Sequence, residues 1–183
     1  MSALFLVEIV PAASSDANPA LATLAAVHDR VRDAGAQLIE AQVAAGNGRL
    51  FVIIEADHAR QVALALAGLV AEEVSDPSRV RLVGADLGEI KAARPQAGYL
   101  VEWDLPAELD MDTYLARKQA KSPLYANVPE VSFLRTYVRE DMAKCLCFYD
   151  APDTAAVQRA RAAVSTPIDR LHALISLPQA VKL

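Results

Sequence analysis

The stretch AQLIEAQVAAGNGRLFVIIEAD, residues 36–57, decides the fold, because the chain repeats its pattern later. Shifted by 95 residues without a gap, it lies over VSFLRTYVREDMAKCLCFYDAP, residues 131–152. Each copy has two strand-like runs, a polar turn and an acidic exit, although almost no residues are identical. Further back, LVEIVP at residues 6–11 matches LVEWDLP at residues 100–106. A period this long exceeds a solenoid unit, so it predicts two domains of one fold in tandem.

The first half has signals for a strand, a helix, a hairpin, a helix and a strand. Asn18, Pro19 and Gly35 bracket the first helix as a cap, a first-turn proline and an exit glycine. Asp57 is expected to cap the second helix, which runs to about Val70. The strands are expected at residues 4–10, 38–44, 49–55 and 80–83. This βαββαβ order is that of the ferredoxin-like unit.

The same order follows after a break rich in proline and glycine. Residues 91–98, KAARPQAG, are the expected linker, so the predicted domains are residues 1–90 and 99–183. Asp110 and Asp153 are expected helix caps, and Thr166 with Pro167 suggests a short helical turn before a strand near residues 174–177. The predicted fold class is α+β: tandem ferredoxin-like repeats packed sheet to sheet as a pseudo-symmetric dimeric α/β barrel. This packing would bury the sheet faces that the helices leave bare.

Composition limits the function classes. The net charge is −5 and no basic field is visible, so nucleic acid is an unexpected partner. The apolar start MSALFLVEIV carries Glu8 and lacks a basic leader, and no apolar run is long enough to span a bilayer, so we expect no membrane partner. Two cysteines in CLC form no disulfide framework, which favours a cytoplasmic protein with reduced thiols. A homo-oligomer is compatible with the sequence.

Aromatic residues gather in the second half, which holds eight of the ten. Rings with polar tips are common in pocket walls, whereas a core built from larger side chains explains the same bias. Arg117, Lys118 and Lys121 share the helix before Tyr125, either as a solvated face or as a rim that attracts an acid. The candidate ligand-binding residues are Trp103, Phe133, Tyr137, Tyr149, Lys118 and Glu8.

Strand alternation places Arg135 on the same face as Phe133 and Tyr137, looking into the space between the repeats. Carboxylates of Glu8, Glu40, Glu102 and Asp104 are expected to meet Arg135 there, since a buried arginine needs a carboxylate partner or an anionic ligand. A structural bridge between repeats is one interpretation. In a catalytic interpretation, Glu102 or Asp104 is the base, Arg135 stabilises negative charge, and Tyr137 or Tyr149 orients the substrate.

The thiols of Cys145 and Cys147 point to the same side of one strand. They are either small apolar side chains beneath a helix or ligands of a soft metal. The three histidines, His28, His58 and His172, are isolated in the sequence, and no phosphate loop, dinucleotide fingerprint or nucleophile elbow is visible.

Residues 99 to about 178 resemble a family of small bacterial ferredoxin-like proteins typified by a nickel-binding, nickel-responsive member. The resemblance rests on YLVEWDLP, PEVSFLRTYV and CLCFYDAPDTAAVQRARAAVSTPIDRLH. It implies a ferredoxin-like fold and histidine ligands for nickel. Where those histidines are expected, the chain has Trp103, Asp104, Arg161 and Thr166. A site without imidazole would rely on Cys147 and carboxylates, which disfavours nickel.

Three functions are compatible with these patterns. The favoured one is a small-molecule binding protein or cofactor-free enzyme, with a pocket in the second repeat or between the repeats. The second is a transition-metal binding or sensing protein that uses Cys147 and Cys145. The third is a protein-protein interaction module with a filled interior. The sequence does not decide between an enzyme and a binding protein, and it names no cofactor.

Overall fold

The computed structural model describes residues 1–46 and 48–178, and these have the expected α+β class. They divide into two compact units. The first contains residues 1–80, 86–96 and the segment from Ile175, and the second contains residues 81–85 and 97–174. No described helix combines the length and the hydropathy that crossing a bilayer requires.

In the first unit, the first strand of the chain has partner strands along both edges. β2 (Gln37–Val43) pairs with β3 (Leu50–Ala56), and β3 pairs with β1 (Ala3–Pro11), all antiparallel. The other edge of β1 is shared by β4 (Ala71–Val74) and the beginning of β5 (Ser78–Val83). The helices are α1 (Pro19–Asp33), α2 (Ala59–Leu66) and α3 (Leu87–Ala93). The strand order second, third, first, fourth is that of the ferredoxin-like unit.

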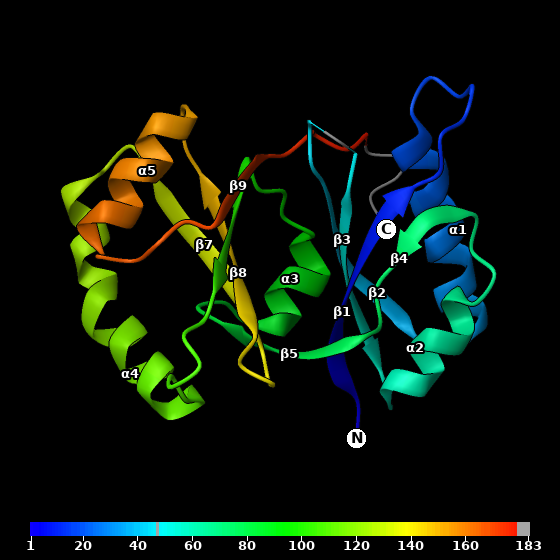
Figure 1. Cartoon of the computed structure of the whole chain (residues 1–183), viewed down its shortest axis with the longest axis horizontal. Coiled ribbons are helices and arrows are strands. Elements are labelled where there is room, and N and C mark those ends of the chain that lie inside the picture. Colours follow the sequence, from blue (N-terminus) through cyan, green and yellow to red (C-terminus); the bar gives the residue numbers. More distant parts are fainter. Residues whose placement is uncertain (47, 179–183) are drawn as a thin grey trace. The chain divides into compact units, whose positions relative to one another are not determined.

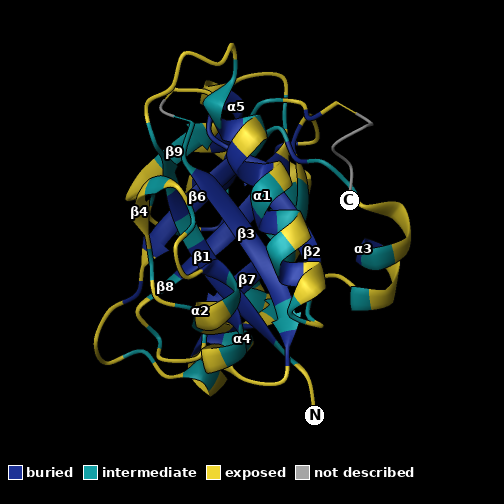
Figure 2. Ribbon diagram, turned by 90° about the vertical axis from the view of Figure 1, so that its right-hand side faces the viewer, coloured by how far each residue is buried: buried dark blue, intermediate teal, exposed yellow. Residues whose placement is uncertain are grey.

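The second unit repeats this order with β7 (Ser132–Arg139), β8 (Lys144–Asp150), β6 (Tyr99–Asp104) and β9 (Arg170–Ala173). Its helices are α4 (Met111–Lys121), the 3₁₀ helix η1 (Ser122–Asn127) and α5 (Thr154–Ala163). In each unit the main helices lie on one side of the strands, α1 and α2 in the first and α4 and α5 in the second (Figure 1). The strands beneath them are buried, as the dark β1 and β3 show in Figure 2.

In each unit a hydrophobic core lies under the helices. In the first unit, aliphatic side chains such as Leu24 and Val27 of α1 pack on Val52 of β3. In the second, Val157 of α5 packs with Val101 and both cysteines. Cys145 and Cys147 are buried on this helix-covered face. Their location is therefore the one expected if they are small side chains beneath a helix.

Several expected boundaries need correction. The helix predicted from Asp57 to about Val70 is capped by His58 and ends at Leu66, because the backbone leaves helical geometry at Ala67, with ψ 129°, and continues into Gly68 with a positive φ of 71°. The edge strand β4 was not predicted, and α3 extends into the segment expected to be a linker. No helical turn forms at Pro167, and the last strand among the described residues ends at Ala173 instead of lying at 174–177.

A β-bulge interrupts the second strand of each unit. The two bulges fall at equivalent positions when the two hairpins are aligned with a shift of 95 residues. In β2 the register shifts between Leu38 and Glu40, and in β7 it shifts between Phe133 and Arg135. The extra residue reverses the alternation of side chains. The expectation that Phe133 shares a face with Arg135 is therefore wrong. Phe133 pairs with Tyr149 of the neighbouring strand and lies on the helix-covered face. Arg135 pairs with Phe148 and lies on the other face.

Candidate functional site

A pocket opens in the second unit between the helices and the covered face of the sheet. We call it the α4–α5 pocket. The space in it that the centre of a water-sized sphere can occupy is about 30 Å³, within an empty volume of about 380 Å³ that includes solvent at the mouth. The lining combines aromatic rings, basic side chains and a thiol: Trp103, Tyr114, Arg117, Lys118, Lys121, Ser122, Tyr125, Cys147, Arg161, Val164 and Thr166.

Helix α4 supplies most of the basic wall. Asp110 caps it by accepting a hydrogen bond of 2.8 Å from the backbone N–H of Thr113. Tyr114 and Lys118 are one turn apart, so they share a face of the helix. The Tyr114 ring is buried against Trp103, at 6.2 Å between ring centroids. The Arg117 guanidinium lies over the Trp103 ring and donates a hydrogen bond to the carbonyl of Ser165.

Arg161 supplies a buried cation from α5. Its side chain lies on the apolar face of an alanine-rich helix, and the residue is 3% exposed. One terminal nitrogen donates to Cys147 Sγ at 3.5 Å and Tyr149 Oη at 3.2 Å, and the other donates to the carbonyl of Pro167 at 2.5 Å. Its Nε–H has no hydrogen-bond partner among the described residues. A buried donor without a partner is costly, so this nitrogen indicates a place for an acceptor.

Cys147 borders the same pocket. Its sulfur accepts a hydrogen bond from Thr136 Oγ1 at 3.3 Å and lies 3.8 Å from Cys145 Sγ. The pKa of the Cys147 thiol lies well below its usual value. The hydrogen bond with Cys145 is the main cause, and the charges of Lys118 and Arg161 add to it against the effect of burial. The pKa of the Cys145 thiol is raised, chiefly by its hydrogen bond with Cys147 and by burial.

Aromatic hydroxyls and rings complete the inner wall. The hydroxyls of Tyr125 and Tyr149 are 2.8 Å apart, and burial raises the pKa of both. Phe133 stacks on Tyr125 at 5.4 Å between centroids, and the Lys118 ammonium lies over the Phe133 ring at 4.1 Å. These rings provide apolar area next to cations, the combination expected for an organic anion.

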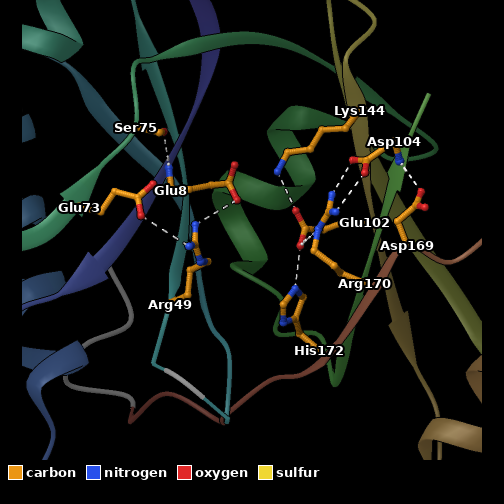
Figure 3. Close-up of polar contacts among 10 residues, drawn as sticks. All are labelled: Glu8, Arg49, Glu73, Ser75, Glu102, Asp104, Lys144, Asp169, Arg170 and His172. Carbon is orange, nitrogen blue, oxygen red and sulfur yellow. Dashed lines mark hydrogen bonds and ion pairs between the residues drawn. The ribbon is translucent and has the colours of Figure 1, made fainter. Parts of the chain in front are cut away.

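The predicted base, Glu102, lies in a different environment (Figure 3). Its carboxylate accepts hydrogen bonds from Lys144 Nζ at 2.7 Å, Arg170 Nε at 2.9 Å and His172 Nε2 at 2.7 Å. Burial raises the pKa of Glu102, but the hydrogen bonds from His172 and Lys144 and the charges of Lys144 and Arg170 lower it to about 2. Such a carboxylate is a weak base at neutral pH.

Asp104 extends this network to the surface. Arg170 binds both of its carboxylate oxygens, at 3.0 and 2.5 Å, and the side chain of Asp104 is 53% exposed. The expectation that Asp104 lies in the interior is therefore wrong, because the last residue of β6 reaches solvent. The Asp169 carboxylate holds the strand end by accepting a hydrogen bond from the Asp104 backbone N–H at 2.7 Å (Figure 3).

Glu8 belongs to the first unit. Its carboxylate lies 3.7 Å from Arg49, which also approaches Glu73 at 3.8 Å, and its backbone N–H donates to Ser75 Oγ (Figure 3). Glu40, also in the first unit, is buried and accepts a hydrogen bond from Gln42.

In the second unit, Arg135 and Tyr137 lie on the face of the strands opposite the helices. Both are buried, and both contact the Phe148 ring: the guanidinium lies over it at 5.1 Å, and Tyr137 meets it edge to face.

The residues near the thiols do not fit a nickel ion. Within residues 1–46 and 48–178, no three His, Cys, Asp or Glu side chains gather as they would around a metal. The two sulfurs lie beside the cations of Lys118 and Arg161, which repel a divalent ion. The imidazole of His172 is held by Glu102. The donor set lacks the nitrogen ligands that nickel prefers.

The α4–α5 pocket brings together part of the predicted set. Trp103, Lys118 and Cys147 line it, and Tyr149 and Phe133 support its wall. The main residue that the sequence analysis did not assign to the site is Arg161. The available signal was spacing, because Arg161 follows Val157 by four residues and so falls on the buried face of an otherwise apolar helix.

One comparison concerns the unit that contains this pocket. Residues 99–174 match the family model described as nickel responsive protein SCO4226-like. The resemblance noted from the sequence is thereby confirmed for the second half of the chain. No curated protein is similar enough to count as a relative.

Solved structures share the fold. A provisionally named chlorite dismutase, TA0507, is 11% identical with a TM-score of 0.51, over 95% of this chain and 94% of the other. A provisionally named monooxygenase from Lactobacillus acidophilus NCFM is 10% identical with a TM-score of 0.52, over 95% and 93%. Another from Fusobacterium nucleatum is 10% identical with a TM-score of 0.51, over 97% and 93%. At these identities the likeness shows the fold alone.

Proposed function

We propose that the protein binds a small organic anion, a carboxylate on an apolar body, in the α4–α5 pocket of the second unit. The observation that carries this proposal is the buried guanidinium of Arg161, whose Nε–H has no partner among the described residues. An anion in the pocket would give that donor an acceptor.

The charge of the pocket supports the same ligand class. Its described lining contains four cations, Arg117, Lys118, Lys121 and Arg161, and no Asp or Glu. Lys118 and Arg161 come from different helices, so they can approach a carboxylate from two directions. The rings of Trp103 and Tyr114 offer apolar contact for the rest of the molecule.

The proposal uses neither Glu102 nor Asp104 as a base, because both are engaged by Arg170 and Glu102 has a pKa of about 2. A catalytic role for Arg135 stays a prediction. Because the thiols lack further ligands among the described residues, we do not favour the metal-binding alternative.

Calorimetric titration with benzoate and its neutral analogue benzamide tests the proposal. Benzoate should bind at least about tenfold more tightly, the factor that one charge-assisted hydrogen bond supplies. Lys118→Gln should remove most of this preference. Arg159→Gln is the matched control, because Arg159 is an exposed arginine of α5 that pairs with Glu130 and does not line the pocket. Equal affinity for the two ligands, or equal losses in both variants, would refute the proposal.

We infer that the two units are copies of one ferredoxin-like fold. The support is their shared strand order and the bulge residues Ile39 and Leu134, which are 95 positions apart, as in the sequence alignment of the hairpins. The packing of the repeats into a barrel stays a prediction.

A further inference from the structure

Anion binding does not require the thiol of Cys147, yet this thiol is part of the pocket lining. The residue is 1% exposed and its sulfur borders the α4–α5 pocket. Three groups approach that sulfur: Arg161 at 3.5 Å, Thr136 at 3.3 Å and Cys145 at 3.8 Å. A cysteine that serves only as a small apolar side chain needs none of these donors.

The surroundings of the sulfur favour its ionised form. The charges of Lys118 and Arg161 stabilise a thiolate, and Cys145 can donate its proton in a hydrogen bond to it. The tyrosines nearby, Tyr114 and Tyr149, have raised pKa values because they are buried, so they stay neutral. The described lining of the pocket brings no carboxylate close to compete for the cations.

We propose that Cys147 is a nucleophile toward a small organic acid bound in this pocket, specifically one with a leaving group on the carbon next to the carboxylate. The inference rests on the proposed function, because the cations that hold the carboxylate also bring that carbon to the sulfur. Arg161 contacts the sulfur, lines the pocket and has an Nε–H without a partner among the described residues, so in this proposal one side chain positions both reactants.

The step is a substitution. The lone pair of the Cys147 thiolate forms a bond from Sγ to the carbon, the bond from that carbon to the leaving group breaks, and the leaving group departs with its electron pair. The thiol proton goes to solvent before the step, and no oxidant or reductant takes part. The carboxylate stays paired with the cations throughout.

Iodoacetate and iodoacetamide test this inference, because they differ in charge and share iodide as the leaving group. The rate of modification at Cys147 is followed by peptide mass spectrometry in the Cys145→Ser variant, which keeps a hydroxyl donor beside the sulfur. The preference for iodoacetate over iodoacetamide is compared with that of free N-acetylcysteine. We expect the preference to be about tenfold or more higher at Cys147, the rate factor of one charge-assisted hydrogen bond.

Matched variants assign the preference to the pocket. Lys118→Gln should reduce it and Arg159→Gln should leave it unchanged, and benzoate should slow the reaction with iodoacetate. A preference equal to that of N-acetylcysteine overturns the inference, as does modification at the rate of global unfolding. If benzoate still binds in calorimetry in that case, the anion-binding function stands alone. If benzoate neither binds nor protects and the preference is absent, both are overturned.

Discussion

At the scale of single residues, two buried charged side chains of the second unit, Glu102 and Arg161, have different surroundings. Glu102 has its negative charge balanced by Lys144 and Arg170 within hydrogen-bond distance. Arg161 has the Pro167 carbonyl, the Tyr149 hydroxyl and the Cys147 sulfur as hydrogen-bond partners, and its Nε–H has none among the described residues. A carboxylate balanced in this way contributes to the fold, whereas a buried donor without a partner indicates a place for an acceptor.

Neutralising Glu102 should therefore destabilise the protein. Glu102→Gln leaves Lys144 and Arg170 without this counter-charge, and the free energy of unfolding at pH 7 should fall by about 3 kcal/mol. Urea titration measures this loss. The exposed Glu108→Gln is the matched control and should leave stability within about 0.5 kcal/mol of the original.

The same carboxylate sets an acid limit. Its pKa is about 2 in the folded protein and 4.5 ordinarily, so its contribution is complete above about pH 4.5 and is lost as the pH falls toward 2. Urea titrations at several pH values in this window should show a shallower decline in Glu102→Gln than in the original protein. Parallel declines would mean that Glu102 does not control acid stability.

At the scale of elements, the bulge in β7 explains what the sequence could and could not predict. Strand alternation correctly separated Arg135 and Tyr137 from Thr136 and Val138, and the caps at Asp110 and Asp153 were predicted from residue type. Alternation could not show the extra residue at Leu134, because any residue can occupy a bulge. The side of the sheet on which Phe133 lies was therefore mistaken, and with it the location of the aromatic wall.

The turn after β5 should be intolerant of a side chain. Gly84 has a positive φ of 86°, and a Cβ there would lie 2.9 Å from Phe133 Cε1. Gly84→Ala should lower the free energy of unfolding by about 2 kcal/mol, through backbone strain and a clash with the ring. Gly35→Ala shares the positive φ, 72°, but meets nothing within 4 Å, so it should lose about 1 kcal/mol. Equal losses in urea titration would mean that the Phe133 contact is unimportant.

The cap of α5 should matter to stability and to the pocket, because this helix carries Arg161. Asp153 accepts a hydrogen bond of 2.7 Å from the backbone N–H of Ala156. Asp153→Ala should cost about 1 kcal/mol in urea titration, and Asp153→Ser should recover most of it, since serine also caps. If alanine and serine behave alike, the hydrogen bond does not stabilise the helix start.

At the scale of the whole molecule, the charge distribution favours a selective pocket over a general anion-binding surface. The chain carries a net charge of −5, whereas the described lining of the α4–α5 pocket holds four cations. The overall field repels anions, so affinity has to come from direct contacts in the pocket. Small anions that fit should be preferred over polyanions for this reason.

Ligand binding should also be visible in the unfolding of the second unit. Trp103 is the chain's only tryptophan and lines the pocket, so its fluorescence reports on that unit, whereas far-ultraviolet circular dichroism reports on the whole chain. Benzoate at 100 times its dissociation constant should add about 2.7 kcal/mol to the free energy of unfolding seen by fluorescence. The midpoint in urea should rise with an unchanged slope. Arg161→Gln should abolish the rise while Arg159→Gln keeps it, and a rise of equal size in both variants would place the anion somewhere other than beside Arg161.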